Sequence, residues 1–123
     1  MNALSVGDFL LRPKLLGVTH VGVWMGGGAV FHNAPDRGEH ISSVAEFAKG
    51  EPVRIEPKNA DPLTVIGRVR AKLSRPREYD PISNNCEHSA NEVVTGHPFS
   101  DQLRAVLAIV MVIGVAWVAL RKR

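Results

Sequence analysis

The chain contains a single cysteine, Cys86, within the run Ser83-Asn84-Asn85-Cys86-Glu87-His88. A lone thiol cannot form an internal disulfide, so it is a core residue, a metal ligand or a nucleophile. A thiol becomes nucleophilic at a helix N-terminus, where unpaired N–H groups and the peptide dipoles stabilise the thiolate. The residues around Cys86 therefore indicate which role it has.

This run predicts a helix N-terminus. Asn84 is a favoured N-cap residue, and Glu87 three positions later can complete a capping box. Cys86 then lies in the first turn, where its N–H can stabilise an oxyanion formed on a carbonyl that the sulfur attacks, with Asn84, Asn85 and Glu87 as support. We expect a nucleophile; the alternative is a small buried residue on an ordinary capped helix.

Two histidines are candidates for the base. The β-rich runs 17–25 and 29–33 are separated by three glycines, which predicts a hairpin. If the loop has an odd number of residues, for instance all three glycines, His32 lies opposite Gly22 and on the same face as His20; a two-residue turn would separate the histidines. We expect the odd loop, with space over Gly22 that suits a helix carrying the thiol.

The division of labour follows from imidazole chemistry. His20 would accept the Cys86 proton and later protonate the leaving group or activate the incoming nucleophile. His32 would bond the far nitrogen of His20 and fix its tautomer.

A zinc site formed by these three residues and His88 is conceivable. However, Cys-x-His at a helix start is not a usual chelating pair, and the chain has no second cysteine. We expect no metal and no cofactor. His88 is expected to be structural, and His40 and His97 are assigned to loops.

Composition indicates one small domain. At 123 residues the chain can bury one core. Its formal charge is +3, but only 11 of the 15 basic residues precede position 104, against all 12 acidic residues. Phosphate binding needs a concentrated basic face, so no nucleic acid partner is expected.

Residues 61–74 predict a helix with Asp61 as N-cap and Pro62 at the first position. The apolar stripe that it would bury consists of Leu63, Ile66, Val69 and either Leu73 or Val65. The basic residues of this region are Arg68, Arg70, Lys72, Arg75 and Arg77. They are expected to form a solvated face, with a membrane-facing patch as the alternative.

Residues 105–120 carry no charge and are flanked by Arg104 and Arg121-Lys122-Arg123. A small domain could hide only one side of such a helix, although the stretch is shorter than the roughly 20 residues that usually cross a membrane. We expect a catalytic domain at 1–102 and a transmembrane anchor at 103–123. The lack of a signal peptide favours a cytoplasmic domain, whereas the positive-inside rule favours the opposite orientation.

Several features together resemble the lecithin:retinol acyltransferase family, which includes the H-Ras-like suppressor phospholipases/acyltransferases. They are the run Asn84-Asn85-Cys86-Glu87-His88, the pair His20 and His32, the opening Gly7-Asp8, and Gly96-x-x-x-Ser100-Asp101-Gln102. The resemblance covers almost the whole chain, including its apolar C-terminal segment. It matches Cys86 to the nucleophile, His20 to the base and His32 to the orienting member.

The resemblance implies an α+β, circularly permuted papain-like fold of the NlpC type, with an antiparallel sheet packed on the helix that bears the cysteine. It also implies a thiolate that takes an acyl chain from a glycerophospholipid and passes it to water, an amine or an alcohol. The partners would be a phospholipid membrane and an acyl acceptor. The family commonly has an aromatic residue after Cys-Glu-His, where this chain has Ser89, which leaves the substrate open.

Two other functions remain as alternatives. One is a peptidase or amidase of the related NlpC class, which would require export. The other is a catalytically silent membrane-binding protein of the same fold.

An N-terminal run could also contact the headgroup region or could form a strand and its packing. Its residues are Phe9, Leu10, Leu11, Leu15 and Leu16, with Arg12 and Lys14 between them.

Overall fold

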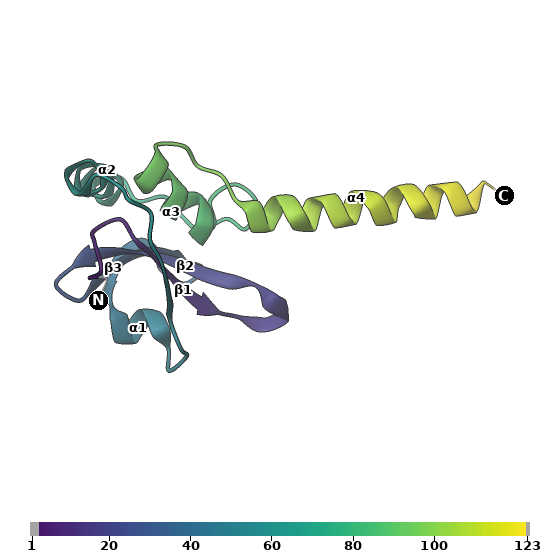
Figure 1. Ribbon diagram of the computed structural model, residues 1–123. Coiled ribbons are helices and arrows are strands. Elements are labelled where there is room, and N and C mark those ends of the chain that lie inside the picture. Colours follow the sequence, from purple (N-terminus) through teal and green to yellow (C-terminus); the bar gives the residue numbers. More distant parts are fainter. Residues whose placement is uncertain (1–2, 123) are drawn as a thin grey trace.

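The computed structural model describes residues 3–122 and has a mixed α+β fold (Figure 1). Its antiparallel sheet has the strand order β4-β3-β2-β1-β5. The strands are β1 (Phe9–Pro13), β2 (Thr19–Gly26), β3 (Ala29–Ala34), β4 (Gly38–Ser43) and β5 (Arg54–Glu56). The helices are α1 (Val44–Ala48), α2 (Pro62–Ser74), α3 (Cys86–Thr95) and α4 (Asp101–Arg121), with a short 3₁₀ turn, η1 (Leu15–Gly17). The predicted α+β class with an antiparallel sheet is therefore confirmed.

Helices cover both faces of the sheet. In Figure 1, α2 and α3 lie over one face and α1 lies against the other. The larger core, on the α2 and α3 side, consists of Phe9, Val21, Val23, Phe31, Val65, Val69, Cys86, Ala90 and Val93. The smaller core, on the α1 side, consists of Leu10, Val30 and Phe47. The thiol of Cys86 thus belongs to the core on the α2 and α3 side.

The β2–β3 hairpin has the predicted register but not the predicted loop. Gly26 pairs with Ala29, so the turn contains only two residues, Gly27 and Gly28, with φ values of 58° and 80°. Such positive values suit glycines in a tight hairpin turn. An irregularity between Trp24 and Gly26 places one extra residue in β2. Beyond it, the two strands pair in the register that a loop with an odd number of residues would give. His32 therefore lies opposite Gly22, as expected.

The predicted cap of α2 is confirmed, because the Asp61 side chain accepts a hydrogen bond from the Thr64 N–H and Pro62 starts the helix. The predicted apolar stripe is partly wrong. Val65 and Val69 are buried, whereas Leu63 is 79 % exposed. The helix is rotated so that Lys72, one turn beyond Val69, also faces inward. A buried carboxylate explains that rotation.

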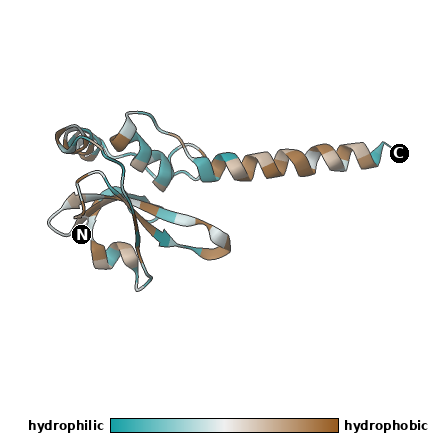
Figure 2. Cartoon of the chain, viewed as in Figure 1, coloured by the Kyte–Doolittle hydropathy of each residue, from teal (hydrophilic) through white to brown (hydrophobic). Residues whose placement is uncertain are grey.

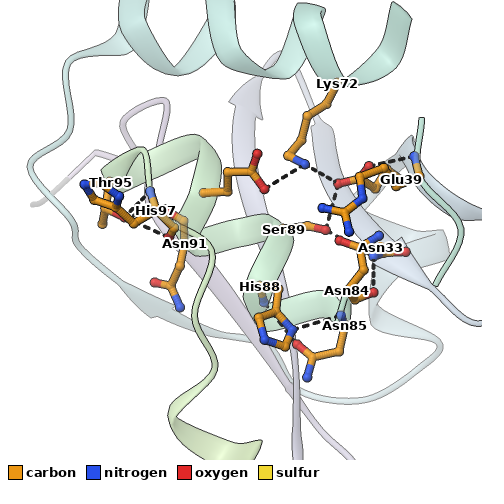
Figure 3. Close-up of polar contacts among 12 residues, drawn as sticks. Asn33, Glu39, Lys72, Asn84, Asn85, His88, Ser89, Asn91, Thr95 and His97 are labelled. Atoms are coloured by element: carbon orange, nitrogen blue, oxygen red, sulfur yellow. Dashed lines mark hydrogen bonds and ion pairs between the residues drawn. The ribbon is translucent and has the colours of Figure 1, made fainter. Parts of the chain in front are cut away.

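That carboxylate belongs to Glu39 of β4, whose side chain is fully buried. Lys72 Nζ lies 2.8 Å from Glu39 Oε2, a pair drawn in Figure 3. Lys72 Nζ also lies 2.9 Å from Glu92 Oε2 of α3. Ser89 Oγ donates to Glu39 Oε2, and the Arg77 N–H donates to Glu39 Oε1, both at 2.8 Å. A charge removed from water is tolerated only with such partners. This cluster therefore holds α2, α3 and the chain before α3 against β4.

α4 has 21 residues and is exposed over its apolar length (Figure 2). A helix of that length spans about 31 Å, close to the roughly 30 Å of a hydrocarbon core. Among the helices within residues 3–122, α4 is the one that is long and apolar enough to cross a membrane. Its N-terminus is tied to the domain, because Gln102 Oε1 accepts from Thr19 N and Gln102 Nε2 donates to Thr19 O.

Replacing Lys72 by Met tests the buried cluster. The methionine retains the apolar stem but leaves the Glu39 carboxylate without its cation, so we expect the free energy of unfolding to fall by about 3–5 kcal/mol. Arg37→Gln is the matched control, since Arg37 and Glu46 form an ion pair in which both side chains are more than half exposed. Such a pair contributes about 0–1 kcal/mol. Denaturant unfolding of the full chain in micelles measures both variants, and equal losses would contradict a buried ionic constraint.

Candidate active site

Cys86 is the first residue of α3, and the helix is capped one residue later than predicted. Asn85 Oδ1 accepts hydrogen bonds from the N–H groups of Glu87 and His88, both at 3.0 Å. The ring of His88 completes the capping box, because its Nδ1 accepts from Asn85 N at 3.1 Å. The predicted cap by Asn84 with Glu87 is therefore wrong, whereas the structural role of His88 is confirmed. Cys86 remains in the first turn, as predicted.

Asn84 and Glu87 support the helix start in other ways. The Asn84 side chain donates to the Glu78 carbonyl, and the Asn84 carbonyl accepts from Asn33 Nδ2 of β3, a contact visible in Figure 3. Both contacts fix the loop that leads into α3. Glu87 Oε1 accepts from Ser100 Oγ at 2.7 Å and from the Gln102 N–H at 2.9 Å. Glu87 thus ties the start of α3 to the start of α4.

The sulfur of Cys86 lies against an unpaired edge of β2. Pairing between β2 and β3 begins at Gly22 and His32, so residues 19–21 of β2 pair with β1 alone. Cys86 Sγ is 3.9 Å from the carbonyl oxygen of Thr19, the residue before His20. The open edge of the strand is what allows a helix N-terminus to approach here.

A cavity of about 180 Å³ adjoins the thiol. Its lining residues at the α4 end are Leu103 and Val106, and Val18 contributes from the chain before β2. Tyr79 also lines it. Burial, followed by the nearby Cys86 sulfur, raises the pKa of the Tyr79 phenol, which therefore keeps its proton and remains a hydrogen-bond donor at neutral pH. The cavity is mainly apolar and continues toward the first turns of α4, where Leu103 and Val106 line it.

The two predicted histidines meet on the face of the sheet that α1 covers, opposite the face that packs against α3. His20 Nε2 and His32 Nδ1 are 2.9 Å apart, and His32 Nε2 lies 2.8 Å from Ser42 Oγ of β4. Ser42 Oγ donates its single proton to the Ser43 carbonyl, so it accepts a proton from His32 Nε2. With both rings uncharged, His20 Nε2 then donates to His32 Nδ1. This assignment leaves the lone pair of His20 on Nδ1.

The space over Gly22 is filled by Phe47 of α1 and not by the helix that carries the thiol. A Cβ on Gly22 would lie 2.7 Å from Phe47 Cε2. The Phe47 ring stacks on His20 with centroids 5.3 Å apart and meets His32 edge-on at 5.2 Å. The expectation of α3 in this space is therefore wrong, because alternation along β2 directs His20 and Gly22 toward α1.

A second cavity, of about 410 Å³, lies beside the histidines. His40 lies in β4 rather than in a loop, with its ring 4.2 Å from that of His32. The charged residues that line the cavity are Arg12, Lys14, Asp36, Arg37, Glu46 and Lys49. Lys14, next to the end of β1, borders both this cavity and the one at Cys86.

The structure brings His20 and His32 together, and it brings Cys86 to the main chain beside His20. Within the described residues, however, no hydrogen bond joins Cys86 Sγ to either imidazole. The imidazole pair thus lies on the α1 side of β2, whereas the thiol lies on the side of α2 and α3.

Burial keeps the Cys86 thiol and the His20 imidazole neutral. It is the main cause that raises the pKa of the Cys86 thiol above its usual value, although the main chain of Val21 and the charge of Lys14 act in the opposite direction. Burial, aided by His32, lowers the pKa of His20 to about 3, and burial, aided by His40, lowers that of His32 to about 3. At neutral pH the resting site therefore holds a thiol and an imidazole rather than an ion pair.

Sequence reasoning missed four residues of the site: Lys14, Ser42, Tyr79 and Gln102. Ser42 could be recognised only by pairing β3 with β4, a strand without a clear alternating pattern. The stretch that contains Gln102 was part of the family resemblance, but its contact with Thr19 bridges 83 positions. No local pattern indicates such a contact.

Comparisons with known proteins do not assign the chain to a family. The sequence matches no family model and no curated protein. The resemblance to the lecithin:retinol acyltransferase family therefore stays a prediction.

Removing the Ser42 hydroxyl tests the hydrogen-bond chain. In Ser42→Ala, His32 Nε2 loses its acceptor, so we expect His20 and His32 to exchange between tautomers instead of holding one. Long-range ¹H–¹⁵N spectra of labelled protein in micelles report the protonated nitrogen of each ring. Ser43→Ala is the control, because the Ser43 side chain caps α1 and takes no part in the hydrogen bonds that link His20, His32 and Ser42. A wild-type spectrum with the proton on His20 Nδ1 would contradict the assignment.

The pH dependence of Cys86 alkylation tests the neutral resting state. Because burial raises the thiol pKa, the thiolate fraction at pH 7 is small. We expect the rate with iodoacetamide to rise about tenfold per pH unit from pH 6 through pH 8. The comparison is Cys86→Ser combined with Ser74→Cys, an exposed thiol whose profile should lie at lower pH. A plateau below pH 7 for Cys86 would instead indicate a thiolate–imidazolium pair.

Proposed function

We propose that the protein is a membrane-anchored, thiol-dependent phospholipase A1/2 and acyltransferase. The observation that carries this proposal is the position of Cys86 at a capped helix N-terminus, beside an apolar cavity that continues to the root of α4. A nucleophile so placed meets an acyl chain at the point where a lipid would leave the membrane.

The order of the elements also supports the proposal. Strands that carry His20 and His32 precede the helix that starts with Cys86. This is the order of a circularly permuted papain-like fold of the NlpC type, in which the sheet packs on the helix that bears the cysteine. The hydrogen-bonded pair of imidazoles then takes the place that His and Asn or Asp occupy in other triads.

The chemistry follows from the tautomer assignment. Cys86 Sγ attacks the ester carbonyl while its proton passes to His20 Nδ1, and the Cys86 N–H faces the oxyanion. His20 returns the proton to the departing lysophospholipid oxygen, leaving a thioester. Water, an amine or an alcohol then gives its proton to His20 and takes the acyl group, the C–S bond breaks, and His20 returns the proton to the departing sulfur, which restores the thiol.

Substrate must complete the contact between sulfur and imidazole. Hydrogen bonds of a catalytic site are often long in the free protein and shorten in the complex. His32 and Ser42 hold the far nitrogen of His20, so the base presents one nitrogen only. The activation of the thiol therefore occurs during attack and not beforehand.

α4 supplies the link to the substrate. We propose that it anchors the protein in a membrane, which holds the domain at a high effective concentration of phospholipid. Affinity for free lipid in solution is then unnecessary.

A non-catalytic membrane-binding protein is the second candidate. The observation that favours it is the neutral thiol without a described hydrogen bond to an imidazole. In that function Cys86 is a core residue, and the histidine chain is structural.

Intact mass spectrometry of the full chain in phosphatidylcholine vesicles tests the proposal. We expect a single acyl adduct on wild-type protein, no adduct on Cys86→Ala, and acylation about 10²–10⁴-fold slower in His20→Gln. His97→Gln, in the loop after α3, is the control and should acylate at the wild-type rate. A folded wild-type protein that never acquires an adduct would favour the non-catalytic candidate.

A further inference from the structure

The β1–β2 hairpin ends in an exposed apolar tip, residues 15–18. Leu15 is 87 % exposed, Leu16 is 99 % exposed and Val18 is 42 % exposed. By contrast, Phe9 and Leu10 of β1 are buried in the domain. Of the N-terminal run that the sequence offered for membrane contact, only the tip is therefore available.

The backbone of the tip holds a leucine in an unfavourable conformation. Leu16 has φ 61° and ψ 33°, in the left-handed region that side chains other than Gly, Asn and Asp rarely adopt. Its nearly complete exposure shows that burial within the domain does not compensate for this conformation. Residues in sparsely populated backbone conformations cluster at functional segments.

The tip and α4 point the same way. In Figure 1 the hairpin extends in the direction of α4, alongside its first turns, and the tip is apolar in Figure 2. Both hydrogen bonds between Gln102 and the main chain of Thr19 join the base of the tip to the first turn of α4. Val18 also lines the Cys86 cavity together with Leu103 and Val106. The tip is thus held at the level where the apolar part of α4 begins.

Charge around the tip suits a lipid surface. Lys14 immediately precedes Leu15. No ion pair in the described part of the chain engages Lys14, whereas Arg12 of β1 lies over the Phe47 ring, 5.9 Å from its centroid. Apolar side chains next to a long cationic one match the boundary between acyl chains and phosphates, where the cation extends toward the headgroups.

We propose that residues 15–18 form a second membrane contact. In this contact Leu15 and Leu16 insert into the headgroup interface of the membrane that α4 crosses, and Lys14 lies among the lipid phosphates. The proposal rests on the membrane anchor of the proposed function and not on its thiol chemistry. Two contacts fix the rotation of the domain about the axis of α4. The cavity at Cys86, which lies between them, then faces lipid.

Depth measurements on the full chain test this contact. Cys86→Ser removes the native thiol, and Leu16→Cys then carries a single nitroxide in phosphatidylcholine vesicles. Oxygen collects in the hydrocarbon and a nickel chelate in water, so their relative effects on the spin label report its depth. Ile113→Cys in the middle of α4 and Arg70→Cys at an exposed position of α2 are the references.

We expect the label at position 16 to lie below the phosphates, between the depths of the two references. Adding Leu15→Glu should return it to water. If position 113 is deep while position 16 is as exposed to the chelate as position 70, the second contact is refuted and the anchor stands. If position 113 is also in water, the anchor itself fails. Protection of position 16 from both reagents, increasing with the ratio of protein to lipid, would assign the tip to a second copy of the chain and refute lipid contact.

Discussion

The placement of the candidate site depends on a buried ion pair between Lys72 and Glu39. The carboxylate also accepts hydrogen bonds from Ser89 of α3 and from the N–H of Arg77, in the segment that leads toward α3. An unpaired charge in this position would cost several kcal/mol, so α2, α3 and that segment cannot shift independently of β4. Cys86, at the first residue of α3, is therefore fixed against the open edge of β2 by charges that lie outside the candidate site.

Burial has a second consequence, for reactivity. The same low-dielectric surroundings raise the pKa of Cys86 and lower that of His20, so neither group is charged at rest. The hydrogen bonds through His32 and Ser42 still leave one nitrogen of His20 with a free lone pair. For the proposed enzyme, the thiol would therefore be activated only when a substrate brings sulfur and imidazole together. In the same proposal, the apolar surface at the start of α4 is the route by which a lipid reaches Cys86.

Local patterns were enough for several elements. The pair Asp61 and Pro62 specifies the start of α2 through a cap and a fixed φ, both of which act within one turn. A long uncharged stretch specifies an exposed α4 because no domain of this size could bury it. The parity of the β2–β3 hairpin, and with it the alignment of His20 and His32, also followed from the sequence, although a bulge and not a longer turn produces it.

The sequence by itself thus determined the helix that begins near Cys86 and the neighbouring histidines, because caps, turns and strand alternation act over a few residues. The α+β class was implied by the family resemblance. Only the tertiary structure decided that Phe47 packs on the histidines, that Ser42 completes their chain, and that the thiol lies on the opposite face of the sheet. Those facts depend on which helix covers which face. Packing of buried side chains and burial of charge make that choice among segments far apart in the chain, and no short pattern records it.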